Sequence, residues 1–447
     1  MKITKEIIER IEGEATIELE WEEDKIAFSK IKFFNYRGIE EIARKRPLYD
    51  ALALTPRVCG ICSHSHAIAA INAVEDCFKN AGETLHVTSK AKVIREIVLN
   101  AEKIHNHIKW YFFSILPELY KIDNPSFDGT AFKERSWFLA QQAIVDILKM
   151  GAIFSGQWPH GSFVMAGGVT CDPLHVDIVN AQSILTRVVI FCEQELYGVP
   201  LEELLSFDSA LQVMATSSAL SLGIEKMQKN GFDILGRSYD RFLALGESFL
   251  YEGSLKASKT TVLAADVGYV SESLAHTFFE NSSDAYTYSK SALYKKAFVE
   301  VGPLARLMIA KNGLIRDYHR RFKDAALTRV VARVVECAHL IERTRFLLSS
   351  LDLSMPSLIE PKKSVHSLCA EGRGIVEAPR GSLIHEVKVR NGIIESYNII
   401  TPTVWNLGNG TRDNLSVTQK ALFGLKTLTE ADFVVKSFDV CSVCTTQ

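Results

Sequence analysis

The sequence predicts a helix-rich α+β fold, with a central bundle of long helices and small peripheral β-sheets. Three observations support this prediction. Only 12 prolines and 26 glycines occur in 447 residues, so long stretches lack the residues that most often end helices. Apolar residues recur at three- and four-residue intervals over several long stretches, which is the helical period. Two shorter regions, about 1–40 and 376–405, alternate apolar and polar residues as β-strands do.

The N-terminal β region contains a predicted hairpin over Ala15–Asn35, where two alternating runs flank the polar centre Glu22–Lys25. The helical core follows it. Helical spacing starts at Ser63 and leads to Cys77. Four further stretches show the same spacing and are predicted to be the long helices: Thr88–Phe113, Ala131–Phe154, Asp177–Leu196 and Leu304–Leu351.

The region Leu201–Lys290 is less regular and is expected to hold short strands or loops. The β region about 376–405 includes the dipeptide Asn391-Gly392, a strong signal for a tight hairpin turn. A last helix over about Asp413–Leu425 precedes a tail with two cysteines. We find no internal repeat or linker-like run, so residues 1–447 are predicted to form a single interwoven domain.

Composition narrows the class of protein. Apolar residues make up 47% and charged residues 23%, which is ordinary globular usage and excludes a disordered chain. The net charge is −2, so no basic field attracts nucleic acid. The N-terminal residues lack the apolar core of a secretory signal. The longest apolar clusters are shorter than the ~18 residues of a membrane span, so we expect no transmembrane segment.

The nine cysteines include two pairs with the same spacing, Cys59/Cys62 and Cys441/Cys444. One backbone turn of this kind can aim two sulfurs at one ion, and two turns supply four thiolates, which suit zinc, an iron-sulfur cluster or another soft metal. The pairs are 441 − 62 = 379 positions apart, far more than in an ordinary zinc site. A redox dithiol would explain one pair only. Zinc, a functional metal centre and unrelated thiols all remain open on spacing alone.

The residues around each pair carry a resemblance. Arg57-Val58-Cys59-Gly60-Ile61-Cys62-Ser63-His64-Ser65-His66 resembles the Arg-x-Cys-Gly-x-Cys-x-x-x-His signature of nickel-iron hydrogenase large subunits. Ser437-Phe438-Asp439-Val440-Cys441-Ser442-Val443-Cys444 is similar to their C-terminal Asp-Pro-Cys-x-x-Cys signature, with valine for proline. Five further motifs match in order: Arg10-Ile11-Glu12-Gly13, Arg37-Gly38-Ile39-Glu40, Pro159-His160 with Gly167-Gly168-Val169, Glu377-Ala378-Pro379-Arg380-Gly381, and Pro402-Thr403-Val404-Trp405-Asn406.

The resemblance implies a nickel and an iron ion held by four cysteines, with cyanide and carbon monoxide on the iron. By motif position, Cys59 and Cys441 would bind nickel terminally, and Cys62 and Cys444 would bridge the two metals. Thiolates suit nickel because it is borderline-soft. The implied reaction is the reversible splitting of H2 into a proton and a hydride.

The resemblance also implies roles for residues around the metals. The base is expected to be the thiolate of Cys441, with Arg380 orienting and stabilising charge, because an arginine is a poor base in water. Glu12 would be the first proton carrier beyond Cys441, since a carboxyl group can both accept and donate. The other implied roles are cyanide hydrogen bonds from Arg380 and Thr403, pairing of Asp439 with Arg380, and a donor at His66 near a bridging sulfur.

A second, non-catalytic ion is implied at Glu40, with a backbone carbonyl near Ile399 and the C-terminal residue as further ligands. Gln447 stands where the family has a histidine, and its harder oxygen favours magnesium over iron. A further departure is Glu118, which stands where an aspartate over the metals is common.

Five scattered cysteines form no iron-sulfur pattern: Cys77, Cys171, Cys192, Cys337 and Cys369. Splitting H2 releases two electrons, so an iron-sulfur small subunit is expected as partner in a heterodimer or larger oligomer. The expected function is H2 uptake by a cytoplasmic enzyme, membrane-associated only through partners. Two alternatives are an H2-sensing subunit and a non-catalytic scaffold, either zinc-stapled or like the related quinone-side subunit of respiratory complex I. Retention of all four cysteines argues against the complex I reading.

Overall fold

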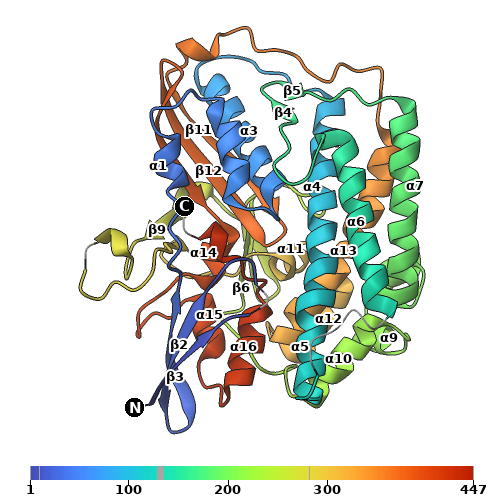
Figure 1. The fold of residues 1–447 in the computed structure, drawn as a ribbon, viewed down its shortest axis with the longest axis vertical. Helices are drawn as coiled ribbons and strands as arrows, with labels where there is room; N and C mark the ends of the chain where they lie inside the picture. The colour runs from blue at the N-terminus through green and yellow to red at the C-terminus, as the bar shows by residue number, and fades with distance from the viewer. Residues whose placement is uncertain (1, 10, 128–134, 281, 446–447) are drawn as a thin grey trace.

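The computed structural model describes residues 2–9, 11–127, 135–280 and 282–445. Long helices form one side of the molecule, and small sheets with shorter helices form the other (Figure 1). The four helices of the bundle are α4 (Ser89–Trp110), α6 (Arg135–Ser155), α7 (His175–Phe191) and α13 (Ala326–Ser350). α4 packs between α6 and α13, and α7 packs on α6 and α13. The predicted helix-rich α+β class with a bundle of long helices is therefore confirmed.

The other helices surround the bundle and the sheets. They are α1 (Ile39–Ala43), α2 (Asp50–Leu54), α3 (Ser63–Asn80), α5 (Leu116–Asp123), α8 (Leu201–Ser206), α9 (Ala210–Met214), α10 (Ala219–Lys229), α11 (Pro303–Ile309), α12 (Gly313–Phe322), α14 (Pro402–Leu407), α15 (Val417–Leu422) and α16 (Leu428–Lys436). The long α3 packs across β11 and β12 of the sheet described below.

Three of the sheets have three antiparallel strands each. They contain β1 (Lys2–Ile7), β2 (Thr16–Glu22) and β3 (Lys25–Lys32); β6 (Arg241–Ala244), β7 (Leu255–Ser258) and β8 (Thr261–Ala264); and β11 (Ala370–Ala378), β12 (Gly381–Arg390) and β13 (Ile393–Ile400). Two-stranded pairs are formed by β4 (Val164–Met165) with β5 (Gly168–Val169) and by β9 (Val270–Ser273) with β10 (Ser291–Tyr294).

Turn chemistry explains both predicted hairpins. Asn391 and Gly392 have positive φ angles of 51° and 73° between β12 and β13. Glu23 and Asp24 have φ angles of 49° and 57° between β2 and β3. Two consecutive residues with positive φ match the twist of the flanking strands, which is why Asn-Gly favours such turns. The N-terminal hairpin gains a third strand, β1, that the sequence pattern did not predict.

Two predicted boundaries were wrong. The stretch Leu304–Leu351 is divided into α11, α12 and α13, and the residues Lys311 and Lys323 at the breaks have φ angles of 57° and 60°, which no helix accommodates. The β region about 376–405 ends at Ile400, because Pro402 is the first residue of α14 and proline favours that position. Both boundary errors arise because apolar periodicity continues across a change of direction. Two further expectations were wrong: the region Leu201–Lys290 begins with the helices α8, α9 and α10, and the last predicted helix is the shorter α15, which is followed by α16.

One helix in the described part of the chain, α6, is long and apolar enough to cross a membrane by length and composition, with a mean hydropathy of 1.3 over its best window. It packs against α4 and α7. The core helix of a bundle has the same composition, so a single such helix is weak evidence for a span.

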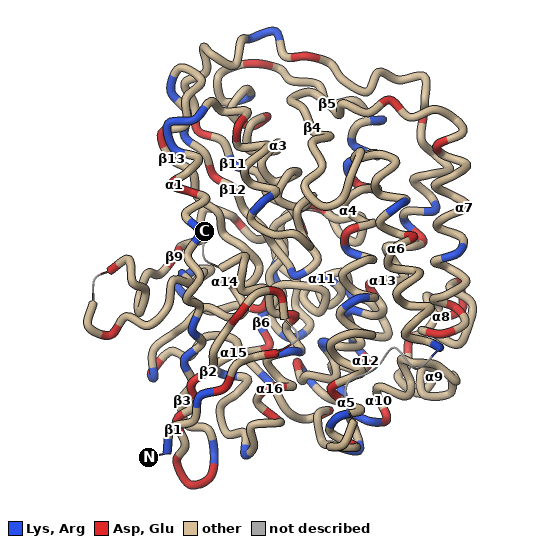
Figure 2. Tube along the Cα trace, viewed as in Figure 1, with Lys and Arg blue, Asp and Glu red and all other residues tan. Residues whose placement is uncertain are grey.

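The C-terminal segment is enclosed by the rest of the chain. α15 packs on β3, and α16 stacks Phe433 on Phe232 at a ring distance of 4.1 Å. The last described residues then enter the main core, where Val440, Cys441 and Cys444 are buried. In Figure 1 these red elements lie between the N-terminal hairpin and the bundle. Basic and acidic residues are mixed along the trace in Figure 2, in agreement with the net charge of −2.

Candidate metal centre

The two cysteine pairs, from opposite ends of the chain, meet in the interior. The Sγ atoms of Cys59 and Cys441 are 3.6 Å apart, and those of Cys62 and Cys444 are 3.5 Å apart. The Sγ atoms of Cys441 and Cys444 are 2.9 Å apart. All four cysteines are buried, and none of them forms a disulfide. The structure thus brings together the four sulfurs that the sequence singled out.

Local structure positions each pair. Cys59 follows a 3-10 turn over Thr55–Val58, and Cys62 caps the start of α3. The backbone N–H groups of Ile61 and Cys62 donate to the Cys59 sulfur at 3.3 and 3.4 Å. Such donors stabilise a thiolate, which is the form that binds a metal.

The second pair is held from two sides. Cys441 forms a parallel β-bridge with Glu12, so the N-terminal segment fixes its backbone. The Thr401 hydroxyl donates to the carbonyl oxygen of Cys444 at 2.8 Å, which fixes the end of the tail. Thr401 directly precedes α14, and Thr403 is in that helix.

Electrostatics favours a cation among the sulfurs. Hydrogen bonds from the thiols of Cys441, Cys444 and Cys62 hold the pKa of Cys59 well below its usual range. Burial raises the pKa of Cys444 well above its usual range. Four buried thiolates would repel one another strongly at these distances. A metal ion removes that repulsion, and four thiolates are a ligand set for a soft or borderline-soft metal.

Arg380 and Asp439 form a charged pair beside the cysteines. The Arg380 guanidinium donates from Nε to the Asp439 carbonyl oxygen at 2.8 Å and from Nη2 to Oδ1 at 2.9 Å. The pKa of Arg380 is lowered by burial, but the charges of Asp439 and of the cysteines outweigh this effect and raise it well above its usual value. Asn106 on α4 donates to Asp439 Oδ2 at 2.7 Å, so the carboxylate is held from both sides.

Among the buried polar atoms without a hydrogen-bond partner in the described structure are two on residues that the resemblance places at the metals. They are Nη1 of Arg380 and Oγ1 of Thr403, and both residues are at most 5% exposed. Buried polar groups are almost always paired, so an unpaired donor indicates a missing partner. The two side chains therefore fit a small polar ligand of the metal.

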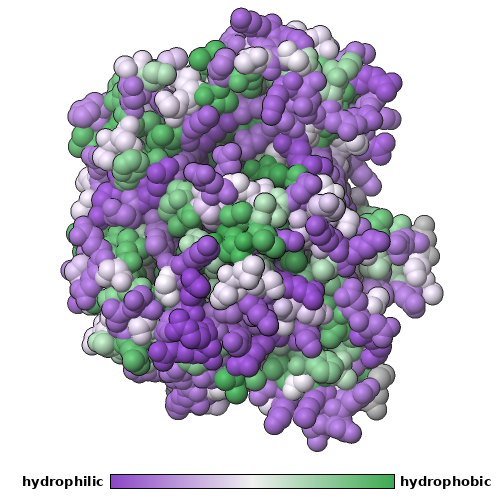
Figure 3. All heavy atoms as spheres, turned by 180° about the vertical axis from the view of Figure 1, so that it is seen from behind, coloured by the Kyte–Doolittle hydropathy of each residue, from purple (hydrophilic) through white to green (hydrophobic). Residues whose placement is uncertain are grey.

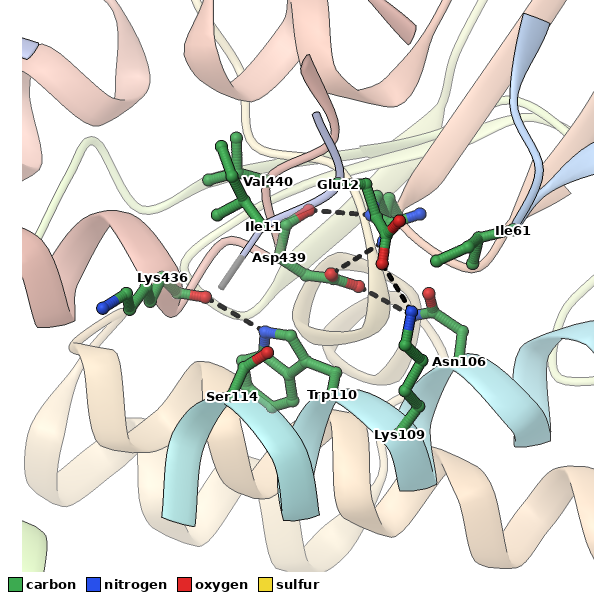
Figure 4. Close-up of a pocket in the computed structure, with 11 residues that line it drawn as sticks. Ile11, Glu12, Ile61, Asn106, Lys109, Trp110, Ser114, Lys436, Asp439 and Val440 are labelled. Atoms are coloured by element: carbon green, nitrogen blue, oxygen red, sulfur yellow. Dashed lines mark hydrogen bonds and ion pairs between the residues drawn. The ribbon is translucent and has the colours of Figure 1, made fainter. Parts of the chain in front are cut away.

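Glu12 lies at the mouth of a pocket beside this pair (Figure 4). Its carboxylate accepts from the Lys109 ammonium at 2.5 Å, and its side chain is 33% exposed. The same pocket is lined by Asn106, Arg380 and Asp439. The position connects the interior near Cys441 with the surface, which suits a group that passes protons.

His66 lies on α3 beside the cysteines. A ring nitrogen of His66 lies within 4.8 Å of the sulfurs of Cys62 and Cys444. Its Nδ1 is 3.0 Å from Nε2 of His385, whose Nδ1 is 2.8 Å from the Tyr397 hydroxyl. Burial lowers the pKa of His66 to about 4, so its imidazole is neutral at neutral pH. A neutral, oriented imidazole of this kind tunes a metal ligand.

The implied second ion site has a different occupant. Glu40 and Ile399 lie together, but the backbone N–H of Ile399 donates to Glu40 Oε1 at 2.8 Å. The Lys290 ammonium contacts both carboxylate oxygens of Glu40, at 2.9 and 3.0 Å. The Lys290 ammonium thus occupies both Glu40 oxygens, so the site with Lys290 in place does not fit a divalent ion. Gln447, the third implied ligand, lies outside the described residues.

Several functional residues escaped sequence analysis. Glu118 does not contact Asp439; its carboxylate accepts from Lys436 at 2.8 Å, and Asn106 is the residue of this region that touches Asp439. Lys109 lies one turn further along α4. The sequence signal that could have indicated Asn106 and Lys109 is the large number of polar residues on α4, a helix that is buried on nearly all sides.

Comparisons with known proteins agree with this geometry. The family described as nickel-dependent hydrogenase matches residues 37–117 and 135–447. The periplasmic [NiFeSe] hydrogenase large subunit of Desulfomicrobium baculatum is 24% identical, covering 99% of this chain and 94% of that protein. The NAD-reducing hydrogenase HoxS subunit beta of Cupriavidus necator is 25% identical, covering 100% and 94%.

Solved structures show the same fold. The Ni-Fe-Se hydrogenase of Desulfovibrio vulgaris Hildenborough in the reduced state superposes with a TM-score of 0.84 at 20% identity, covering all of both chains. The H2-activated enzyme of Desulfomicrobium baculatum gives a TM-score of 0.82 at 21% identity. With four converging cysteines and a family match over most of its length, this chain belongs to the nickel-dependent hydrogenase family.

Proposed function

We propose that this chain is the catalytic large subunit of a nickel-iron hydrogenase that splits H2 in the direction of uptake. The observation that carries the proposal is the buried cluster of four sulfurs beside two unpaired donors. A large-subunit relationship is supported by the family match and by relatives named as large subunits. The direction is supported by a relative named uptake hydrogenase large subunit, which is 23% identical.

The ligand assignment rests on motif position, and the convergence of the four sulfurs supports a shared metal site. Cys59 and Cys441 would hold nickel terminally, and Cys62 and Cys444 would bridge nickel and iron. The unpaired Nη1 of Arg380 and Oγ1 of Thr403 support cyanide on the iron, because bound cyanide accepts hydrogen bonds from buried donors, whereas carbon monoxide is proposed from the family relationship alone. When bound, the metal pair supplies the electron-pair acceptor for heterolysis of H2.

The chain's own residues handle the proton. The Cys441 thiolate takes it, and Arg380 holds a fixed positive charge over the site because Asp439 binds its Nε and Nη2. Glu12, whose backbone lies next to Cys441, receives the proton and passes it toward the pocket mouth. His66 keeps a bridging sulfur oriented without carrying charge.

The electrons need another carrier. Within the described residues, the only groups of three or more metal-ligating side chains belong to the cysteine cluster and His66. We therefore propose an iron-sulfur small subunit as partner. Apolar residues gather near the middle of the face shown in Figure 3, as is usual for a protein interface. We also propose a cytoplasmic location, because none of the nine cysteines forms a disulfide.

Metal analysis with infrared spectroscopy of the purified complex tests the proposal. We expect one nickel per large subunit and infrared bands of iron-bound cyanide and carbon monoxide. Cys444→Ser should abolish both signals. Cys77→Ser is the matched control, because Cys77 is also buried but lies near the far end of α3 from Cys62, outside the cluster.

Other outcomes would contradict the proposal in different ways. One equivalent of zinc without the infrared bands would indicate a zinc-stapled scaffold. The bands with very slow turnover of a dye acceptor would indicate an H2-sensing subunit.

A further inference from the structure

A second cluster of buried charges lies apart from the cysteines, where three segments meet. Lys290 precedes β10, Glu272 is in β9, Glu40 is in α1, and Asn398 with Ile399 is in β13. Lys290 and the two glutamates have side chains that are only 15–19% exposed. Distant parts of the sequence are thus joined through one ammonium group.

The ammonium has the surroundings of a bound cation. Lys290 Nζ lies 2.9 and 3.0 Å from the two oxygens of Glu40, 2.9 Å from Oδ1 of Asn398 and 3.5 Å from Oε1 of Glu272. Burial lowers the pKa of Lys290, but the charges of Glu40 and Glu272 raise it above its ordinary value, so the group is charged.

The neighbours of these oxygens keep the arrangement in place. Ile399 donates its backbone N–H to Glu40 Oε1, and Asn398 Nδ2 donates to Glu272 Oε2 at 2.7 Å. Every side chain around the ammonium is therefore oriented by a second contact. Two carboxylates and an amide oxygen at one point are also the hard donors that magnesium prefers.

We propose that the Lys290 ammonium takes the place of the second metal ion, so that this hydrogenase subunit needs no divalent cation at Glu40. A divalent ion on the Glu40 oxygens that the ammonium already contacts would bring a second positive charge close to it, which is strongly unfavourable in a poorly hydrated site. The ammonium donates to both oxygens of Glu40 and to Oδ1 of Asn398, which uses its three donors, and it makes an ion pair with Oε1 of Glu272 at 3.5 Å.

The cluster also supports the metal-binding tail. Thr401 lies two residues after Ile399 and donates to the Cys444 carbonyl oxygen at 2.8 Å. By fixing the end of β13, Lys290 fixes the segment that carries Thr401 and Thr403. Lys290 acts as a positioning residue. Its ammonium group belongs to the chain and cannot dissociate, unlike an exchangeable ion.

The experiment has one arm on the unmodified protein. The purified complex is treated with EDTA, and its magnesium and manganese contents and thermal midpoint are measured with and without MgCl2. We expect less than one-tenth of an equivalent of either metal, and no shift of the midpoint by EDTA or MgCl2. Nickel content and infrared bands serve as separate readouts of the catalytic centre.

The second part of the experiment tests whether removal of the Lys290 side chain creates a magnesium site. Lys290→Ala leaves Glu40, Glu272 and Asn398 around an empty position, so the variant should lose thermal stability in EDTA and regain at least about 3 °C with MgCl2, because a ligand that binds only the folded state stabilises it. Adding Glu40→Gln to Lys290→Ala should abolish this gain. Lys388→Ala is the matched control, since it removes an exposed lysine–glutamate pair with Glu371 and should create no magnesium dependence.

Two results would overturn the proposal. One is a stoichiometric divalent ion in the unmodified protein whose removal lowers its thermal midpoint. The other is a Lys290→Ala variant as stable as the parent in EDTA and indifferent to MgCl2. If Lys290→Ala does not fold, the first arm still decides. Neither result depends on whether nickel and iron are present, so the assignment of the catalytic centre is tested separately.

Discussion

Glu12 and Cys441 lie side by side in a parallel β-bridge that joins the two ends of the chain. The N–H of Glu12 faces the Val440 carbonyl at 3.4 Å, and the N–H of Ser442 donates to the Glu12 carbonyl at 2.8 Å. The backbone that carries the proposed proton acceptor is thus set by the backbone that carries the proposed proton relay. A change that shifts the backbone of either segment should therefore lower metal retention. A change to the Glu12 carboxylate alone should affect proton transfer only.

Gly13→Ala should undock the C-terminal tail. A Cβ at Gly13 would lie 2.3 Å from Oγ of Ser442 and 2.9 Å from Cγ1 of Val443, at a φ of +83°. Nickel retention should fall roughly tenfold for each 1.4 kcal/mol of docking free energy that is lost. Gly253→Ala has a similar φ of +73° and open space around its Cβ, so it separates strain from the clash. Equal nickel contents in the two variants would contradict this account.

Arg380→Lys should impair catalysis while the four cysteines stay intact. A lysine keeps the charge but cannot donate to both atoms of Asp439 and to a further ligand. We expect turnover to fall about 10²- to 10³-fold, with shifted cyanide bands. The control is Arg373→Lys, which alters the ion pair at the surface between Arg373 on β11 and Glu386 on β12. Unshifted bands would show that Arg380 Nη1 does not face the iron ligands.

Glu12→Gln should slow proton transfer without changing the metal centre. The amide keeps the size of the side chain and a contact with Lys109 but cannot carry a proton. We expect the rate of H2/D2O isotope exchange to fall by about 10²-fold or more, with unchanged infrared bands. Glu14→Gln alters an exposed carboxylate two residues away and should have no effect. Normal exchange in Glu12→Gln would exclude this residue from the proton path.

Stability should fall with pH below neutrality because of buried histidines, two of which lie on α4. Burial lowers the pKa of His105 to about 3 and that of His107 to about 4, whereas a histidine in an unfolded chain titrates near pH ~6.5. Between about pH 6.5 and 4 the unfolded chain takes up protons that the folded chain refuses. The free energy of unfolding should therefore drop by up to about 1.4 kcal/mol per pH unit for each histidine.

The variant His105→Phe isolates one of these contributions. Its ring keeps the edge contact with Trp158, whose centroid is 4.8 Å from that of His105. The slope of thermal midpoint against pH should flatten below pH about 6.5. His175→Phe replaces an exposed histidine and should leave the slope unchanged. An unaltered slope in His105→Phe would mean that this histidine does not titrate on unfolding.

The sequence by itself determined the local features. Apolar spacing located α4, α6 and α7, and Asn391-Gly392 located the turn between β12 and β13. The two Cys-x-x-Cys pairs with their flanking motifs indicated the family and the metal chemistry. These features depend on residues close together in the chain, where side-chain period and turn chemistry are decided.

Only the tertiary structure decided which groups meet. It brings Cys59 to Cys441 and Cys62 to Cys444, and it places Asn106 of α4 against Asp439, a contact that the sequence did not predict. It also places the Lys290 ammonium on Glu40, where the family motif implied a metal ion. No local pattern encodes such contacts, because they depend on how long helices and sheets pack and on where buried charges find their partners.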